Sequence, residues 1–250
     1  MKKVFKGIAV LAATAAIGTG VAFAAGCNPT EEAKEVKGEA YALTHGTNKF
    51  ISCATVTVKG DKITDCTLLE IYLPTQIKDT DSKLYETVKY GNVTMTLDGS
   101  DYKVGEQTLN EYFQSEANCK AYYEAAKAGN LKAVVDGSDV ALAWKDLNKA
   151  DNGYWTKQDA NEKDYSRWLW NRDATVKFVK EHGVDGLLTL VKEDEASLTD
   201  PAGATVKSWV WVNGDDTISV GATWGDLSGE KTGFVSYGQL IVNAYEEATK

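Results

Sequence analysis

The sequence predicts an α+β fold in which an antiparallel sheet carries helices packed against it. Apolar and polar residues alternate on both sides of glycine turns at 51–69 and 93–104, as they do in β-hairpins. Further strands are expected at 206–223. The helices expected to cover the sheet show apolar residues at helical spacing and span 109–128, 164–182 and 236–249.

The first 26 residues have the pattern of an export signal. Lys2 and Lys3 precede a small-residue apolar stretch at 8–25. The end of this stretch fits two kinds of cleavage site. Ala22-Phe23-Ala24 suits ordinary signal peptidase, whereas Ala24-Ala25-Gly26-Cys27 resembles a bacterial lipobox, which we favour. Cys27 would then carry a lipid that holds the exported chain at the outer face of the cytoplasmic membrane.

Residues 27–39 are polar and charged without an apolar period, which is typical of a linker. The rest, 40–250, is expected to form one domain with an insertion at about 98–200. The formal net charge is −9, and the leader takes with it three lysines and no acid, which leaves 24 basic and 36 acidic residues. An acidic balance of this size argues against nucleic acid as a partner, because nucleic-acid binding depends on neutralising phosphates.

The first hairpin holds two of the four cysteines. If Val58 lies opposite Ile63, Cys53 and Cys66 share one face of the hairpin but lie diagonally, about 7–8 Å apart. That separation is at the limit of a disulfide, so a bridge would require a register shift. No Cys-x-x-Cys pair or Cys/His cluster occurs, and no metal site is predicted.

The middle of the chain begins with the 93–104 hairpin, which turns at residues 98–101. Thr108 and Glu111 then form a capping box for a helix that Gly129 ends. Cys119 falls on the apolar face of that helix, so we expect a small core residue rather than a reactive thiol.

In the second half of the chain, the secondary structure is left open for one segment and is predicted for the others. Residues 132–144 fit a strand or a helix equally well. Asp164 is placed to cap a helix that stops at Gly183, and 184–191 are apolar and expected to be helical. Ser236 opens a capping box for the last helix, whose apolar residues keep strict helical spacing.

Between these helices lies the stretch around which the functional prediction is built. Residues 206–212 alternate Val and Trp and are apolar on both faces, which is typical of a strand covered on both sides. A turn at Gly214-Asp215 follows, and then Ser219-Val220-Gly221-Ala222-Thr223, which presents a hydroxyl beside two small residues.

This run, followed by a capped terminal helix, resembles the FMN-binding domain found in the C subunit of the sodium-pumping NADH:quinone reductase and in exported flavoproteins of bacterial electron transfer. In that family an Asp, two spacer residues and Ser/Thr-Gly-Ala-Thr carry FMN as a phosphoester on the last Thr, attached by a separate flavin transferase. Residues 54–65 resemble the first hairpin of the same domains, in which a strand ends in Gly-Asp-Lys and the next begins with Ile.

The resemblance implies a role for individual residues. Thr223 would accept the FMN, and Gly221 and Ala222 would leave room for it. A second Gly-Ala-Thr ends at Thr205. The remaining residues expected at the flavin are Asp216 and Ser219, which match the motif with one residue inserted, and Trp211 and Trp224, whose rings would pack on the isoalloxazine.

Two functions therefore remain open. The first is a membrane-tethered extracellular flavoprotein that relays electrons to a redox partner at the cell surface. The second is a surface lipoprotein of similar fold that binds a small or carbohydrate-like ligand, or a protein partner, through aromatic residues without flavin. A stand-alone hydrolase is not indicated, because His45 and His182 are the only histidines and neither lies near a nucleophile motif.

Overall fold

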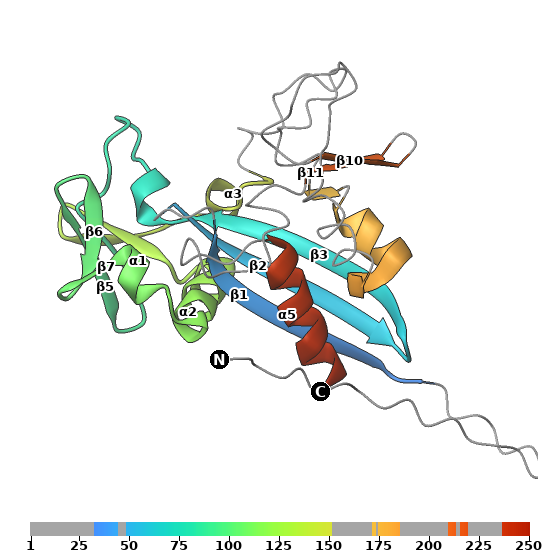
Figure 1. Ribbon diagram of the computed structural model, residues 1–250. Helices are drawn as coiled ribbons and strands as arrows, with labels where there is room; N and C mark the ends of the chain where they lie inside the picture. The colour runs from blue at the N-terminus through green and yellow to red at the C-terminus, as the bar shows by residue number, and fades with distance from the viewer. Residues whose placement is uncertain are drawn as a thin grey trace, which may run out of the picture. The chain divides into compact units, whose positions relative to one another are not determined.

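The computed structural model has the α+β class that the sequence predicts, with antiparallel sheets and helices packed against them (Figure 1). The strands that it describes form three separate sheets rather than the single sheet expected. The described residues are 33–44, 49–151, 172–173, 175–185, 210–213, 216–219 and 237–250.

The first sheet is a meander of three long strands, β1 (Glu35–Thr44), β2 (Phe50–Lys59) and β3 (Lys62–Tyr72), in the order β1-β2-β3. The β2–β3 hairpin confirms the prediction for 51–69, and Gly60 adopts a φ of 65° at its turn, a conformation that glycine reaches without strain. β1 begins inside the predicted linker, so 35–39 are strand.

The β2–β3 register differs from the one expected, and this separates the two cysteines. Val58 does lie opposite Ile63, but an irregularity between Thr57 and Val58 shifts the pairing, so that Cys66 lies opposite Val56. Since neighbouring residues of a strand point to opposite faces, Cys53 and Cys66 now lie on opposite faces of the sheet. They belong to different apolar clusters and both are free thiols.

The second sheet has the order β7-β6-β5-β4-β8-β9 and contains the predicted 93–104 hairpin, now as β5 and β6. The region left open at 132–144 forms the β8–β9 hairpin and the start of α3 (Trp144–Leu147). A short 3₁₀ helix, Pro74–Gln76, follows the first sheet. The strands of the second sheet are β4 (Thr87–Tyr90), β5 (Val93–Asp98), β6 (Asp101–Val104), β7 (Gln107–Thr108), β8 (Lys132–Val135) and β9 (Ser138–Ala141).

The helix expected at 109–128 is divided into α1 (Leu109–Tyr112) and α2 (Glu116–Lys127). The capping box of Thr108 and Glu111 opens α1, and Gly129, with a φ of 70°, follows the end of α2, as predicted. The break is stable because side chains of α2 bind the carbonyl groups it frees: the Asn118 amide donates to Tyr112 O at 2.8 Å, and the Cys119 thiol lies 3.0 Å from Phe113 O. Cys119 is fully buried, as expected.

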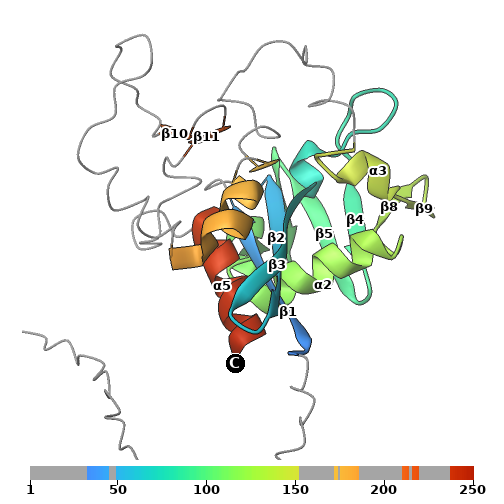
Figure 2. The ribbon, with the colours of Figure 1, turned by 90° about the vertical axis from the view of Figure 1, so that its right-hand side faces the viewer.

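The meander is covered on both faces (Figure 2). On one face α2 and residues of the second sheet complete a large aromatic cluster. On the other lie α5 (Tyr237–Thr249), which confirms the predicted last helix, and helical residues at 175–185. These run two residues beyond Gly183, the expected stop, and the predicted start at Asp164 lies outside the described residues.

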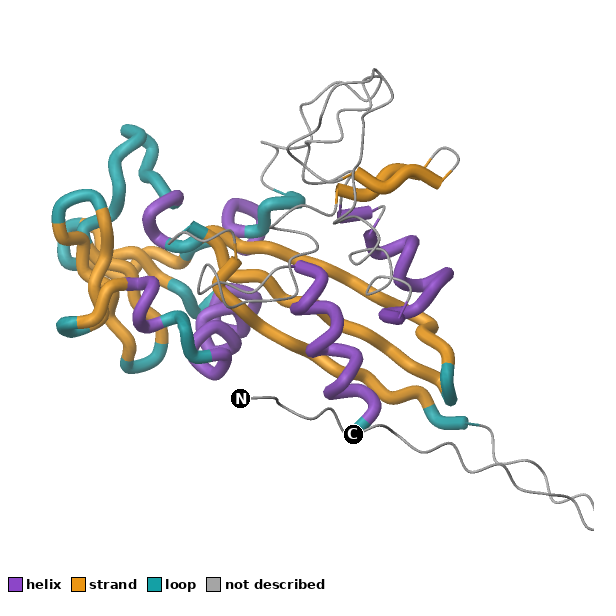
Figure 3. The backbone as a smooth tube through the Cα atoms, in the orientation of Figure 1, coloured by secondary structure: helices purple, strands orange, loops and turns teal. Residues whose placement is uncertain are grey.

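The third sheet is the two-stranded hairpin of β10 (Val210–Asn213) and β11 (Asp216–Ser219), drawn with the other strands in Figure 3. Its register pairs Asn213 with Asp216, which confirms a strand on each side of the predicted turn, whose residues 214–215 lie outside the described part of the chain. Residues 206–209 of the expected strand lie outside the described part of the chain.

Candidate functional site

The residues predicted to bind flavin are described only in part. Trp211, Asp216 and Ser219 lie on the β10–β11 hairpin, where Trp211 pairs with Ile218 and Ser219 with Val210. The structure therefore brings these three onto one hairpin. Outside the described residues lie Gly221, Ala222, Thr223 and Trp224, the second motif at Thr205, and the expected lipidation site Cys27.

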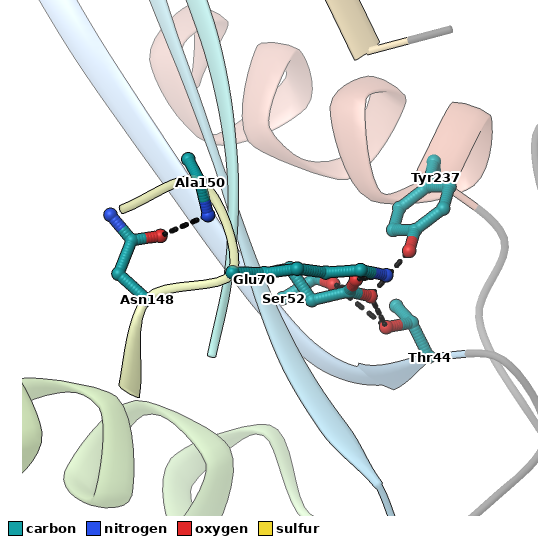
Figure 4. A network of polar contacts seen from close by, with 7 residues as sticks. Thr44, Ser52, Glu70, Asn148, Ala150 and Tyr237 are labelled. Carbon is teal, nitrogen blue, oxygen red and sulfur yellow. Dashed lines mark hydrogen bonds and ion pairs between the residues drawn. The ribbon is translucent and has the colours of Figure 1, made fainter. Parts of the chain in front are cut away.

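The described residues do contain a buried polar cluster at the end of the meander that lies near the start of α5 (Figure 4). Its centre is Glu70 on β3, which has no solvent exposure. We call it the Glu70 cluster. Its members come from five segments of the chain and are Thr44, Ser52, Glu70, Lys149 and Tyr237.

The strand register explains how three members meet. Ser52 lies directly opposite Glu70, and Thr44 is diagonal to Ser52 on the same face. Thr44 donates to Glu70 Oε1 at 2.9 Å, while Ser52 Oγ lies 3.1 Å from Oε1 and 2.7 Å from Thr44 Oγ1. Since each hydroxyl holds a single hydrogen, the two hydroxyls supply two hydrogens for these three contacts, and either of them can be the donor in the Thr44–Ser52 contact.

The other two members arrive from distant parts of the chain. Tyr237, the first residue of α5, donates its hydroxyl hydrogen to Glu70 Oε1. Lys149, two residues after α3, donates from Nζ to Oε2, and its backbone N–H donates to the Glu70 carbonyl at 2.9 Å. Both carboxylate oxygens are thus bound, and one side chain connects β3, the segment after α3, and α5.

Lys149 is the unusual member, because a lysine is seldom buried without a partner. Only 2% of it is exposed, and its Nζ lies 4.2 Å from the centre of the Phe50 ring. Burial lowers the pKa of Lys149 below its ordinary value, and the charge and hydrogen bond of Glu70 oppose that change. Both charged groups have lost their hydration, and the ion pair with its hydrogen bonds takes the place of that hydration.

The chemistry of the Glu70 cluster is that of positioning. Its two charged groups are shielded from solvent, so a substrate does not reach them. The cluster fixes the end of β1 and the start of α5 relative to β3, because Thr44 is the last residue of β1 and Tyr237 is the first residue of α5. The carboxylate holds both points within hydrogen-bond distance of one another.

Sequence reasoning missed the cluster. The one local signal is an acidic residue in an apolar run, Leu68-Leu69-Glu70-Ile71, at an inward position of a strand. Tyr237 falls on the apolar face of the predicted last helix, and that pattern gives no sign of a polar role. Lys149 gave no signal, because nothing near it in sequence shows that it is buried.

Two surface pockets lie elsewhere on the described residues. One of about 480 Å³ lies between the β2–β3 turn, residues 179–185 and Tyr245, and includes His182. The other, about 340 Å³, lies at the outer edge of β1, where Glu116 accepts the Tyr41 backbone N–H at 3.0 Å. Its lining combines the buried side chains of Phe113 and Cys119 with polar residues such as Glu116 and Asn243.

Among the described residues, no group of three or more His, Cys, Asp and Glu side chains is arranged to hold a metal ion. None of their helices is both long and apolar enough to span a membrane.

Comparison of the chain with family models, with curated proteins and with solved structures gives no match.

Proposed function

We propose that this chain is a membrane-tethered extracellular flavoprotein that carries FMN on Thr223 and relays electrons. The tether is a lipid on Cys27, and a flavin transferase attaches the cofactor. Outside the cytoplasm a dissociated flavin is lost by dilution, whereas a covalent one keeps a high effective concentration at its site. The protein then shapes the surroundings of the flavin, and the flavin carries the electrons.

One observation supports this proposal most. The terminal helix α5, which follows the Gly221-Ala222-Thr223 run in the sequence, packs on the meander that contains the hairpin resembling the FMN-binding family. The hairpin at 54–65 and the terminal helix α5, which follows the motif in the sequence, therefore belong to one packed unit. Aromatic side chains near Thr223 in sequence, Trp211 and Trp224, supply flat partners for an isoalloxazine ring.

The test is an intact mass and a visible spectrum of the full chain, co-expressed with a flavin transferase in a host that exports it. The expected result is flavin absorbance with the mass increment of one FMN, absent from Thr223→Ala and retained in Thr205→Ala. If the increment is lost in Thr205→Ala instead, the acceptor is the second motif. No increment in the wild type contradicts the proposal, and ligand screening would turn to the pocket above Phe113.

A further inference from the structure

β1 is an edge strand of the meander, because β2 alone among the described strands pairs with it. The Tyr41 N–H points away from β2, since it donates to Glu116 Oε1 at 3.0 Å. In a strand the N–H and C=O of one residue point to the same side, and residues two positions apart repeat that direction. The carbonyl groups of Tyr41 and Leu43 therefore both point away from β2, and two hydrogen-bond acceptors lie at this outer edge.

The pocket of about 340 Å³ lies at the same edge. Its lining comes from β1, from the start of α2 with the two residues at 113–114, and from Asn243 on α5, and these two helices lie on either side of β1 (Figure 2). A volume of this size is at the lower end for small-molecule sites. It suits a molecule of a few heavy atoms rather than an additional strand.

The polar groups at the pocket are mainly acceptors. Within the described part of the chain, no donor binds the carbonyl oxygens of Tyr41 and Leu43 or the second carboxylate oxygen of Glu116. All residues that line the pocket are described, and Glu116 is the charged one among them. Such a set of groups favours a ligand that carries a positive charge and donates several hydrogen bonds, because charge-assisted bonds are the strong ones.

Two lysines lie near Glu116 without lining the pocket. Lys120 has its Nζ 3.8 Å from the carboxylate of Glu124, one turn further along α2. Lys250 pairs with Glu247. Their charges, and the positive end of the α2 dipole, reduce the attraction of Glu116 for a cation, so only a modest affinity is expected.

We propose that this pocket binds a small primary ammonium ion with an aliphatic tail. A primary ammonium group has three N–H donors, which match the Glu116 carboxylate and the carbonyl oxygens of Tyr41 and Leu43. The tail is matched by the apolar side chains in the lining, among them Leu43 and Phe113. The site involves neither the flavin nor the residues expected to bind it, so this binding activity goes beyond the proposed function.

The probe is n-butylammonium, titrated into the full chain at constant ionic strength and followed through backbone amide shifts in NMR spectra. We expect saturable binding with a dissociation constant of about 1 mM, with the largest shift changes at residues 41–43 and at Asn243. Two comparison ligands separate the contributions, since n-butanol keeps the tail without the charge and tetramethylammonium keeps the charge without N–H donors. Each should bind roughly tenfold more weakly or worse.

Glu116→Gln is the matching variant, because it removes the charge and keeps an oxygen that accepts the Tyr41 N–H. It should weaken the binding of n-butylammonium about tenfold or more. Glu106→Gln is its control: it removes the same charge from an exposed residue in the turn between β6 and β7, outside the pocket, and should leave the affinity unchanged. Circular dichroism establishes that both variants fold.

Three results would overturn the inference. The first is the absence of saturable binding up to about 50 mM n-butylammonium. The second is equal affinity in the wild type and Glu116→Gln, because the carboxylate would then have no part in binding. The third is binding of n-butanol or tetramethylammonium as tight as that of the probe, which would assign it to apolar contact or to charge alone. None of these measurements depends on FMN, so this inference and the proposed function fail or stand separately.

Discussion

Gly38 on β1 lies where α5 crosses the meander, and the structure leaves no space there for a side chain. A Cβ added at this position would lie 2.0 Å from the Ala244 carbonyl oxygen and 2.4 Å from the Ala248 nitrogen. Both are backbone atoms of α5, so a rotamer change cannot relieve the contact. Gly38→Ala therefore requires the helix to move away by about 1 Å, because unbonded carbon and oxygen atoms pack at roughly 3.3 Å or more.

The magnitude follows from what that movement disturbs. Overpacking of a core costs about 1–3 kcal/mol, and seven residues of α5 are buried. Exchange of Gly for Ala in an extended strand returns roughly 0.5–1 kcal/mol. Because both contacts are with backbone atoms, the upper end of the overpacking range applies. After the gain from replacing Gly, we expect Gly38→Ala to lower the free energy of unfolding by about 2 kcal/mol, measured by urea denaturation followed by circular dichroism.

A second variant sharpens the test. Ala248→Gly removes only the Ala248 Cβ, which lies 3.0 Å from the added atom, and leaves the two backbone contacts in place. The double variant Gly38→Ala with Ala248→Gly should therefore recover little of the lost stability. Lys37→Ala, at an exposed neighbour on β1, should stay within about 0.5 kcal/mol of the wild type. A Gly38→Ala protein as stable as the wild type would refute the packing of α5 on β1.

Three further predictions concern other parts of the described chain. Lys149→Met removes the cation that pairs with the buried Glu70 carboxylate and should lower the unfolding free energy by about 3–5 kcal/mol. The double variant Lys149→Met with Glu70→Gln should recover most of that loss, because the charge of the carboxylate is then absent as well. A urea double-mutant cycle that shows no coupling would contradict the ion pair. Burial raises the pKa of Cys53 to about 11 and those of Cys66 and Cys119 to about 12, from an ordinary 9.0. Because each folded-state pKa is raised, the stability that these thiols contribute is complete below pH 9 and is lost as pH rises through 11 to 12. At pH 10.5 the loss reaches up to about 2 kcal/mol per thiol, so Cys66→Ala should show a smaller drop in stability between pH 8 and pH 10.5 than the wild type; an equal drop would exclude a contribution from this thiol. Thr108→Ala removes the capping box of α1 and should cost about 1 kcal/mol in urea unfolding, whereas Thr94→Ala, on an exposed position of β5, should cost much less; equal costs would show that the cap contributes nothing.

The sequence by itself determined those features whose cause is local. Gly60 forms its turn because of its own backbone freedom, and Thr108 caps a helix through a residue three positions away. The last helix was found because its apolar face repeats within a few residues. Each of these features needs only neighbours in the sequence, and sequence patterns record neighbours.

The tertiary structure alone decided what depends on distant segments. The irregularity beside Val58 placed Cys53 and Cys66 on opposite faces, and a hairpin pattern does not contain that shift. The division of the strands into separate sheets likewise depends on which strands pair, and many pairing partners are distant in the sequence. The Glu70 cluster is the extreme case, since Tyr237 lies 167 positions from Glu70. A buried charge is stable only when its partners arrive together, and that arrangement belongs to the folded chain rather than to any stretch of its sequence.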